Sequence, residues 1–334
     1  MVFPVSSMFF LFSLFLGSLL SISSSSWFGA WIGLELNLLS FIPLIAIKMN
    51  PYTSEAALKY FLTQALASTL IIMSSCLFLF TPNLSSPLIL MALLLKLGAA
   101  PFHLWFPQVM EGLMWPQAVL LLSIQKLAPM ILISYLLISP TTTQIIILSA
   151  ILSAVVGGLG GLNTTKLRKI MAFSSINHMA WLLTAICIND TAWTMYFLFY
   201  VSISTSVIIF FFFFQATTIS DLLASNRLTL FSTLMIPLSL LSLGGLPPLT
   251  GFIPKWLMIQ FMLSTNMIIP LFFLLSSTLV TLYFYLRITI PFILFLSPSL
   301  SFNIKLLPKH TPLLLLFTLF NFLGLMIPLP FTLF

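Results

Sequence analysis

Stretches of about 20 mostly apolar residues recur along almost the whole chain. A segment of that length and composition crosses the hydrocarbon core of a bilayer as an α-helix. The chain has 334 residues, of which 60% are hydrophobic and only 5% are charged, whereas about 25% of the residues of a soluble domain are charged. We therefore predict an all-α polytopic membrane protein without a separate soluble domain.

Hydropathy and length together predict eleven membrane spans. They cover approximately residues 3–22, 27–47, 56–80, 87–109, 117–138, 143–162, 167–188, 192–215, 229–264, 268–296 and 312–331. The fourth span is interrupted at Pro101, and the ninth by the glycine- and proline-rich segment 244–251. Irregular backbone at membrane depth is tolerated only where protein or a watery cavity surrounds it. We therefore expect both breaks to lie inside the protein.

The basic residues near span ends predict the orientation. They all fall in or beside even-numbered connections between spans: Lys48, Lys59, Lys166, Arg168, Lys169, Arg227, Lys305 and Lys309. The positive-inside rule then places the N-terminus inside and the C-terminus outside. The net charge of +7 is therefore explained by lysines and arginines that fix the orientation of the chain in the membrane and contact lipid headgroups. No stretch that interleaves basic and aromatic residues points to nucleic-acid binding.

The two interrupted spans lie five spans apart, so they cross the membrane in opposite directions. Paired interrupted helices in two inverted halves are a sequence sign of a transport site. We predict one transmembrane domain over residues 1–334, with a first five-helix repeat at about 1–140 and a second at about 141–296. A final helix at about 312–331 would follow the second repeat.

Four ionisable residues lie near the middle of predicted spans: Glu35, Lys96, Lys126 and Lys255. A charge at that depth costs at least ~2.5–3.5 kcal/mol, so it is a functional hypothesis by default. Glu35 is the only acid among them, and we select Lys96 as its partner. Apolar surroundings favour a neutral lysine and a nearby carboxylate favours a charged one, so a changing Glu35–Lys96 separation would load and unload a proton. Static ion pairs that fix helix packing are the alternative.

Two histidines extend this candidate path. His178 lies near the middle of the seventh span, with Ser174 and Ser175 as predicted hydrogen-bond partners. Histidine titrates near neutral pH, which suits a proton relay; a neutral histidine bonded across helices is an equal alternative. His103 follows the break in the fourth span and could continue the path towards the inner side or be structural.

Other site chemistries find no support in the sequence. Cys76 and Cys187 stand alone in apolar runs, which is neither a metal motif nor a disulfide framework. The glycine run 157–161 follows no strand and so is no dinucleotide-binding fingerprint. We expect no metal and no cofactor in this chain.

Five segments together resemble a known family: residues 53–65, 95–105, 125–129, 160–175 and 244–256. They are similar to the antiporter-like subunits in the membrane arm of respiratory complex I, and within these to subunit 2 of animal mitochondrial NADH dehydrogenase. The resemblance maps the family's buried glutamate onto Glu35 and its broken-helix lysines onto Lys96 and Lys255. It maps the central lysine onto Lys126. Gln108 departs from vertebrate forms, which often carry an acid there.

The resemblance implies a core subunit of mitochondrial NADH:ubiquinone oxidoreductase, multi-pass in the inner membrane, with its N-terminus in the matrix and its C-terminus in the intermembrane space. It implies proton translocation coupled to electron transfer, with NADH, FMN, iron–sulfur clusters and ubiquinone in other subunits. The implied partners are other membrane-arm subunits, including antiporter-like ones, and phospholipids, with cardiolipin as a candidate. The alternatives are a free-standing cation/proton antiporter subunit and a structural spacer of the membrane arm.

Overall fold

The structure is a computed structural model that describes residues 5–47, 50–78, 80–137, 139–223, 230–247 and 249–295. Every named element in this part of the chain is an α-helix. The chain divides into two compact units, Met1–Ser153 and Ala154–Phe334. The predicted eleventh span lies outside the described residues, as do Lys48, Arg227, Lys305, Lys309 and His310.

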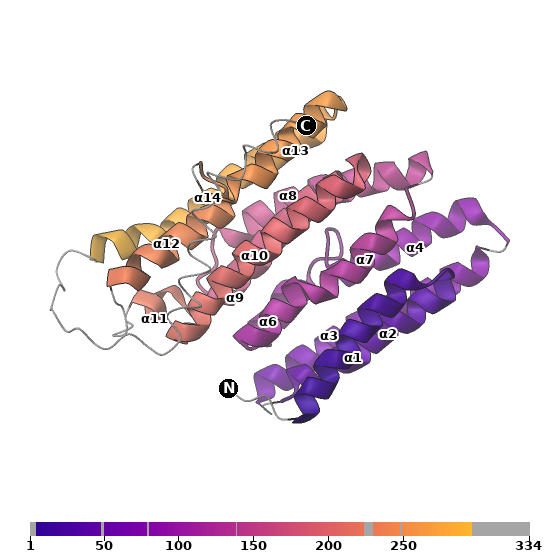
Figure 1. The fold of residues 1–334 in the computed structure, drawn as a ribbon, viewed down its shortest axis with the longest axis horizontal. Helices are drawn as coiled ribbons and strands as arrows, with labels where there is room; N and C mark the ends of the chain where they lie inside the picture. The colour runs from indigo at the N-terminus through magenta and orange to yellow at the C-terminus, as the bar shows by residue number, and fades with distance from the viewer. Residues whose placement is uncertain are drawn as a thin grey trace. The chain divides into compact units, whose positions relative to one another are not determined.

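The first unit is a bundle of antiparallel helices (Figure 1). Its helices are α1 (Val5–Ser23), α2 (Trp27–Ile45), α3 (Pro51–Leu77), α4 (Pro82–Leu97), α5 (Trp105–Gly112), α6 (Trp115–Leu122) and α7 (Ile124–Ser134). Helix α1 packs along α2, α2 along α3, and α3 against both α4 and α5. Helix α7 packs against α1 and α4. Within this unit α2 carries Glu35, α4 carries Lys96 and α7 carries Lys126.

Helix α8 (Pro140–Gly161) spans the boundary between the units. The second unit continues with α9 (Leu167–Ile188), α10 (Asp190–Phe214), α11 (Ile219–Leu223), α12 (Leu230–Gly244), α13 (Phe252–Ser264) and α14 (Ile268–Phe295). Helix α9 packs against α10, α13 and α14, and α10 also packs against α12 and α13. Helix α9 is the most buried of the helices in the described residues that are long and apolar enough to cross a membrane.

Seven helical segments in the described residues are long and apolar enough to cross a membrane, with α6 and α7 counted together as one segment, Trp115–Ser134. The predicted breaks in the fourth and ninth spans are confirmed: the chain leaves the helix between α4 and α5 and again between α12 and α13. The fifth predicted span corresponds to one candidate membrane span, Trp115–Ser134, which contains an irregularity that the sequence did not predict. That span is divided into α6 and α7 at Ser123, which has φ −110° and ψ −81°.

Pro129 gives a physical reason for irregular helix in the fifth span. Proline has no amide hydrogen, so Pro129 cannot bond to the carbonyl four residues earlier, and its ring crowds that carbonyl. Closer to the irregular residue, the amide of Lys126 bonds to the Ser123 carbonyl, three residues back, at 3.1 Å. The irregularity thus lies directly before the central lysine of the sequence.

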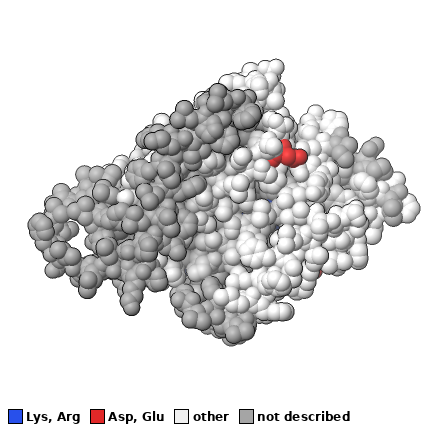
Figure 2. All heavy atoms as spheres, viewed as in Figure 1, with Lys and Arg blue, Asp and Glu red and all other residues white. Residues whose placement is uncertain are grey.

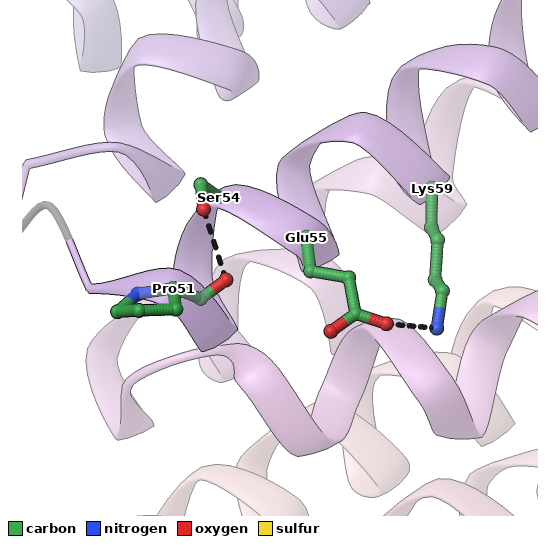
Figure 3. A network of polar contacts seen from close by, with 4 residues as sticks. All are labelled: Pro51, Ser54, Glu55 and Lys59. Carbon is green, nitrogen blue, oxygen red and sulfur yellow. Dashed lines mark hydrogen bonds and ion pairs between the residues drawn. The ribbon is translucent and has the colours of Figure 1, made fainter.

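The described surface is mostly uncharged, and acidic atoms occupy only a small area of the face in Figure 2. Large apolar side chains stand exposed on the outer helices, such as Phe9 (67%) on α1 and Phe272 (68%) on α14. This surface composition suits a lipid environment. Near the start of α3, Lys59 and Glu55 form an ion pair in which the ammonium lies 2.7 Å from the carboxylate (Figure 3). Both side chains are exposed.

Candidate functional site

The first helix break places Lys96 at the end of α4. The helix ends at Leu97, and Gly98 adopts a left-handed conformation with φ +71°. Lys96 lies in the last turn of α4 and is only 7% exposed. The free carbonyls at a helix C-terminus carry partial negative charge. The break therefore gives a buried ammonium a favourable electrostatic environment.

Two neighbouring side chains donate hydrogen bonds to carbonyls at the break. The amide of Gln64, on α3, donates a 3.3 Å hydrogen bond to the Lys96 carbonyl. The indole of Trp105, at the start of α5, donates to the Leu95 carbonyl at 3.1 Å. Such partners are required at membrane depth, where water cannot satisfy backbone groups. Gln64 and Trp105 thus make the irregular backbone around Lys96 stable.

Lys96 and Lys126 line the same cavity inside the first unit. Lys126, on α7, is 2% exposed, and its Nζ lies 5.3 Å from the centre of the Phe106 ring. The polar lining of this cavity comes from these two lysines and from Asn37, Tyr60, Gln64 and Gln125. About 20 Å³ is open to the centre of a water molecule, and roughly 10–15 Å³ is enough for one.

Unsatisfied polar atoms point to water in this cavity. Oδ1 of Asn37 and Nε2 of Gln125 are buried without a hydrogen-bond partner. On its other side, Gln125 accepts a 3.3 Å hydrogen bond from the Tyr60 hydroxyl. A buried water needs two or more such polar partners. The cavity can therefore hold water between Lys96 and Lys126.

Glu35 lies close to this cavity without contacting Lys96. It is half-buried on α2, and its Oε2 atom has no hydrogen-bond partner. The carboxylate interacts electrostatically with both Lys96 and Tyr60. No ion pair within 4.0 Å joins Glu35 to Lys96. The structure therefore places the predicted pair in the same unit, separated but within electrostatic reach.

In the second unit, Lys255 reaches back across the second helix break. It follows the break, on α13, and is 7% exposed. Its Nζ donates a 2.8 Å hydrogen bond to the carbonyl of Gly244, the last residue of α12. Gly245 follows in a left-handed conformation with φ +78°. The Lys255 ammonium thus supplies a hydrogen-bond donor to a backbone carbonyl at the end of the interrupted helix.

His178 lies beside the second break, with tyrosines as its neighbours. It is 8% exposed, and its Nδ1 lies 3.0 Å from the hydroxyl of Tyr196 on α10. The centre of the Tyr200 ring is 5.1 Å from that of the imidazole. A small cavity joins His178, Tyr196 and Tyr200 to Ser242 and Gly251 at the break.

The predicted serine partners are buried one turn before His178. Ser174 and Ser175 are 2% and 1% exposed, and each hydroxyl donates to a carbonyl of its own helix, Met171 at 2.8 Å and Ala172 at 2.7 Å. Ser175 also shares a hydrogen bond with Tyr200. Ser175 is thus linked to the tyrosines beside His178, Tyr196 and Tyr200.

His103 lies in the first break, between α4 and α5, and is half-buried. Its Nδ1 atom is buried without a hydrogen-bond partner. Across the described residues, no group of three His, Cys, Asp or Glu side chains is placed to hold a metal ion. The two cavities are lined by lysine, histidine, amide and hydroxyl side chains.

A family model describes most of this chain. Residues 24–281 match the model of the NADH:quinone oxidoreductase/Mrp antiporter transmembrane family. The NADH-ubiquinone oxidoreductase chain 2 of Anopheles gambiae is 48% identical over 294 residues, which cover 85% of each chain. The chain belongs to this family. The protein of the same name from Elephas maximus is 40% identical, with 98% of this chain and 97% of the elephant chain covered. The resemblance inferred from the motifs is thus confirmed.

Solved structures of similar fold come from three membrane complexes. A chain of respiratory complex I from Thermus thermophilus has a TM-score of 0.83 and 25% identity, covering 98% of this chain and 80% of that one. A chain of an archaeal membrane-bound sulfane sulfur reductase has a TM-score of 0.86 at 17% identity, covering 96% and 73%. A chain of the Mrp complex from Dietzia has a TM-score of 0.72 at 16% identity, covering 84% and 59%. The fold is therefore antiporter-like.

Sequence reasoning missed the neutral polar residues around the charges. Tyr60 and Tyr196 were not singled out, although each contacts a residue of the candidate path or lines its cavity. Gln64 and Gln125 lie within two of the segments that carry the family resemblance, 53–65 and 125–129, but were assigned no role. An available signal was a polar side chain inside an apolar span beside a lysine, as in the Gln125–Lys126 pair.

Proposed function

We propose that this chain is a core membrane-arm subunit of mitochondrial NADH:ubiquinone oxidoreductase and contributes to proton translocation coupled to electron transfer from NADH to ubiquinone. The observation that carries the proposal is the cavity in the first unit, whose wall contains two buried lysines, Lys96 and Lys126, and unsatisfied amides. Its place in the enzyme is supported by the relatives named NADH-ubiquinone oxidoreductase chain 2.

Proton transfer in the first unit would run from Lys96 to Lys126 through the cavity. A carboxylate near a buried lysine favours its charged form, and a retreating carboxylate favours its neutral form. Movement of the Glu35 carboxylate relative to Lys96 would therefore load and unload the lysine. In low-dielectric surroundings each charge movement acts strongly on its neighbours, so Lys126 would take up the released proton by way of a water at Gln125.

In the second unit, Lys255 and His178 would carry the proton onward. Lys255 binds the free carbonyl of α12, and His178 lies against the cavity at the same break. We assign Lys255 to the connection with the next antiporter-like subunit or with an exit. His178 would act as a relay, with Ser174 and Ser175 one turn before it on α9, and His103 would extend the path at the first break.

The proposed location is the mitochondrial inner membrane, with eleven spans, two inverted repeats, the N-terminus in the matrix and the C-terminus in the intermembrane space. One contact supports placing two basic connections on the same side. The loop before α9 pairs with the loop after α10 through the isolated bridge between Lys166 and Thr218. These are the sixth and eighth predicted connections, which the charge pattern assigns to the matrix side.

The partners that we propose are other membrane-arm subunits, including neighbouring antiporter-like ones, and phospholipids with cardiolipin as a candidate. The solved complexes of similar fold support the first of these. NADH, FMN, iron–sulfur clusters and ubiquinone would be bound by other subunits. The exposed apolar side chains of the outer helices suit both lipid and membrane-arm neighbours.

A Lys96→Met substitution in the assembled enzyme tests the proposal. Proton uptake into proteoliposomes, divided by NADH oxidised with ubiquinone, should fall below that of the unmodified enzyme, because the proposed path through this chain would lose the proton-binding group at the end of α4. NADH oxidation by an electron acceptor that bypasses ubiquinone should not change. Lys59→Met is the matched control, because Lys59 is exposed at 41%. Normal pumping by a fully assembled Lys96→Met enzyme would reject the role of Lys96.

The two alternative functions predict different outcomes. The family description also includes Mrp antiporters, which supports the alternative of a free-standing cation/proton antiporter subunit. Such a subunit would migrate on a native gel apart from any NADH-oxidising assembly. A structural spacer would tolerate neutralisation of Lys96, Lys126 and Lys255 once assembly is preserved. Our proposal requires comigration with NADH-oxidising activity and loss of pumping in these variants.

A further inference from the structure

Helix α2 carries two unpaired polar atoms one turn apart. Nε1 of Trp31 and Oε2 of Glu35 are both buried, and neither has a hydrogen-bond partner. One is an indole N–H, which can only donate, and the other is a carboxylate oxygen, which accepts when ionised. An unpaired donor and an unpaired acceptor on the same helix are thus chemically complementary.

Helix geometry brings these two side chains to the same face. Residues at positions i and i+4 of an α-helix are neighbours on its surface, and side chains lean towards the helix N-terminus. The Glu35 side chain therefore leans back over the turn that carries Trp31. The Phe28 ring, 5.6 Å from the Trp31 ring, packs on the indole from the preceding turn.

No other group holds the free carboxylate oxygen. Lys96 and Tyr60 interact with Glu35 electrostatically, but neither forms a hydrogen bond or a close ion pair with it. A buried carboxylate without a donor is costly. Tryptophans near membrane surfaces commonly direct their N–H to water or lipid headgroups, and the Trp31 Nε1 is closed off from such contact.

We propose that Trp31 is a positioning residue for Glu35, and that its indole N–H binds the ionised carboxylate when Glu35 is turned away from Lys96. The Glu35 carboxylate then has two alternative binding partners: the Trp31 indole on its own helix and the Lys96 ammonium at the end of α4. When the carboxylate moves from one partner to the other, rotation of the Glu35 side chain changes its distance from Lys96. This inference rests on the proposed function, because it explains how the Glu35–Lys96 separation is controlled.

A double-mutant cycle in the assembled enzyme tests this role. Trp31→Phe keeps an aromatic ring and removes the N–H, and Glu35→Gln removes the carboxylate charge. Proton uptake per NADH oxidised is measured for both single variants and for Trp31→Phe/Glu35→Gln. We expect Trp31→Phe to lower this ratio about threefold or more, the loss of one hydrogen bond to a charged group being worth at least that, and to have no further effect when Glu35 is already Gln.

The control is Trp193→Phe, which removes an indole N–H from the start of α10, where it bonds to Asp190; it should leave the ratio unchanged. An equal effect of Trp31→Phe with Glu35 or with Gln at position 35 would overturn the proposal, because packing alone would then explain it. A normal ratio in Trp31→Phe would overturn it as well. A normal ratio in Glu35→Gln would instead reject the proposed function.

An experimental structure of the unmodified enzyme gives a second test that does not depend on a variant's assembly. An Nε1 of Trp31 bonded to the Glu35 carboxylate, directly or through one ordered water, supports the proposal in at least one state of the catalytic cycle. An indole that donates to a different acceptor in every state excludes it.

Discussion

Lys255 donates its 2.8 Å hydrogen bond to Gly244 from the far side of a helix break, whereas Lys96 precedes its own break and receives a bond from Gln64 at its backbone carbonyl. The two interrupted helices thus present their lysines from opposite sides of the interruption. In both, a glycine with positive φ begins the break, Gly98 or Gly245. The ammonium of Lys255 is bound to backbone, while that of Lys96 faces a cavity with room for water.

Gly245→Ala should disrupt the second break. The residue has φ +78°, and an added Cβ would lie 2.8 Å from Cδ of Lys255 and 2.9 Å from its Nζ. The left-handed backbone alone costs an alanine about 1–2 kcal/mol. We expect a lower thermal midpoint of the assembled enzyme and reduced pumping. Gly158→Ala is the control, since its Cβ meets nothing closer than 3.6 Å; equal effects of both changes would contradict this account.

Gln64→Leu should loosen the first break. The change removes the amide that donates to the Lys96 carbonyl, and a buried carbonyl without a donor costs about 1–3 kcal/mol. Hydrogen exchange measured by mass spectrometry should become faster in peptides that cover residues 94–106. The exposed Gln144 supplies the comparison, because Gln144→Leu should leave the exchange of these peptides as it is. Unaltered exchange in Gln64→Leu would show that other groups hold the break.

Tyr196→Phe should weaken the placement of His178. The hydroxyl 3.0 Å from Nδ1 is lost, and a neutral hydrogen bond is worth about 0.5–1.5 kcal/mol. We expect a severalfold fall in proton uptake per NADH oxidised with assembly intact. Tyr135→Phe, at a side chain that is 50% exposed, should behave like the unmodified enzyme. Identical pumping in the two variants would remove Tyr196 from the path.

The ionised carboxylate of Asp221 should make the stability of a loop outside the membrane depend on pH. Hydrogen bonds from the side chain of Thr217 and from Thr218 lower the pKa of its carboxyl from 3.8 to about 2. A lowered pKa in the folded state stabilises the loop above pH 3.8, and this stabilisation is lost as the pH falls towards 2. Protection of the Thr218 amide, which donates to Asp221 at 2.9 Å, should therefore be constant from pH 8 to about pH 5. It should be lost in Asp221→Ala throughout that range; a protected amide in this variant would contradict the assignment.

Local composition was sufficient to predict the positions of most helices. The length of an apolar segment predicts a membrane-spanning helix, because lipid offers no hydrogen-bond partners to backbone groups and the helix satisfies them internally. The breaks at Pro101 and at residues 244–251 were predictable because glycine and proline change the backbone itself. The irregularity at Ser123 was not predicted, since neither glycine nor proline occupies that position.

The sequence by itself determined which residues carry charge at membrane depth, since Glu35, Lys96, Lys126 and Lys255 stand out against apolar neighbours. Only the tertiary structure decided what faces each of them: a shared cavity for Lys96 and Lys126, a backbone carbonyl for Lys255, and the electrostatic neighbours Lys96 and Tyr60 for Glu35. The physical reason is that charge is a property of a residue, whereas its partners are brought from other helices by packing. Hydropathy records the cost of burying a group and contains no information about the direction in which its side chain points.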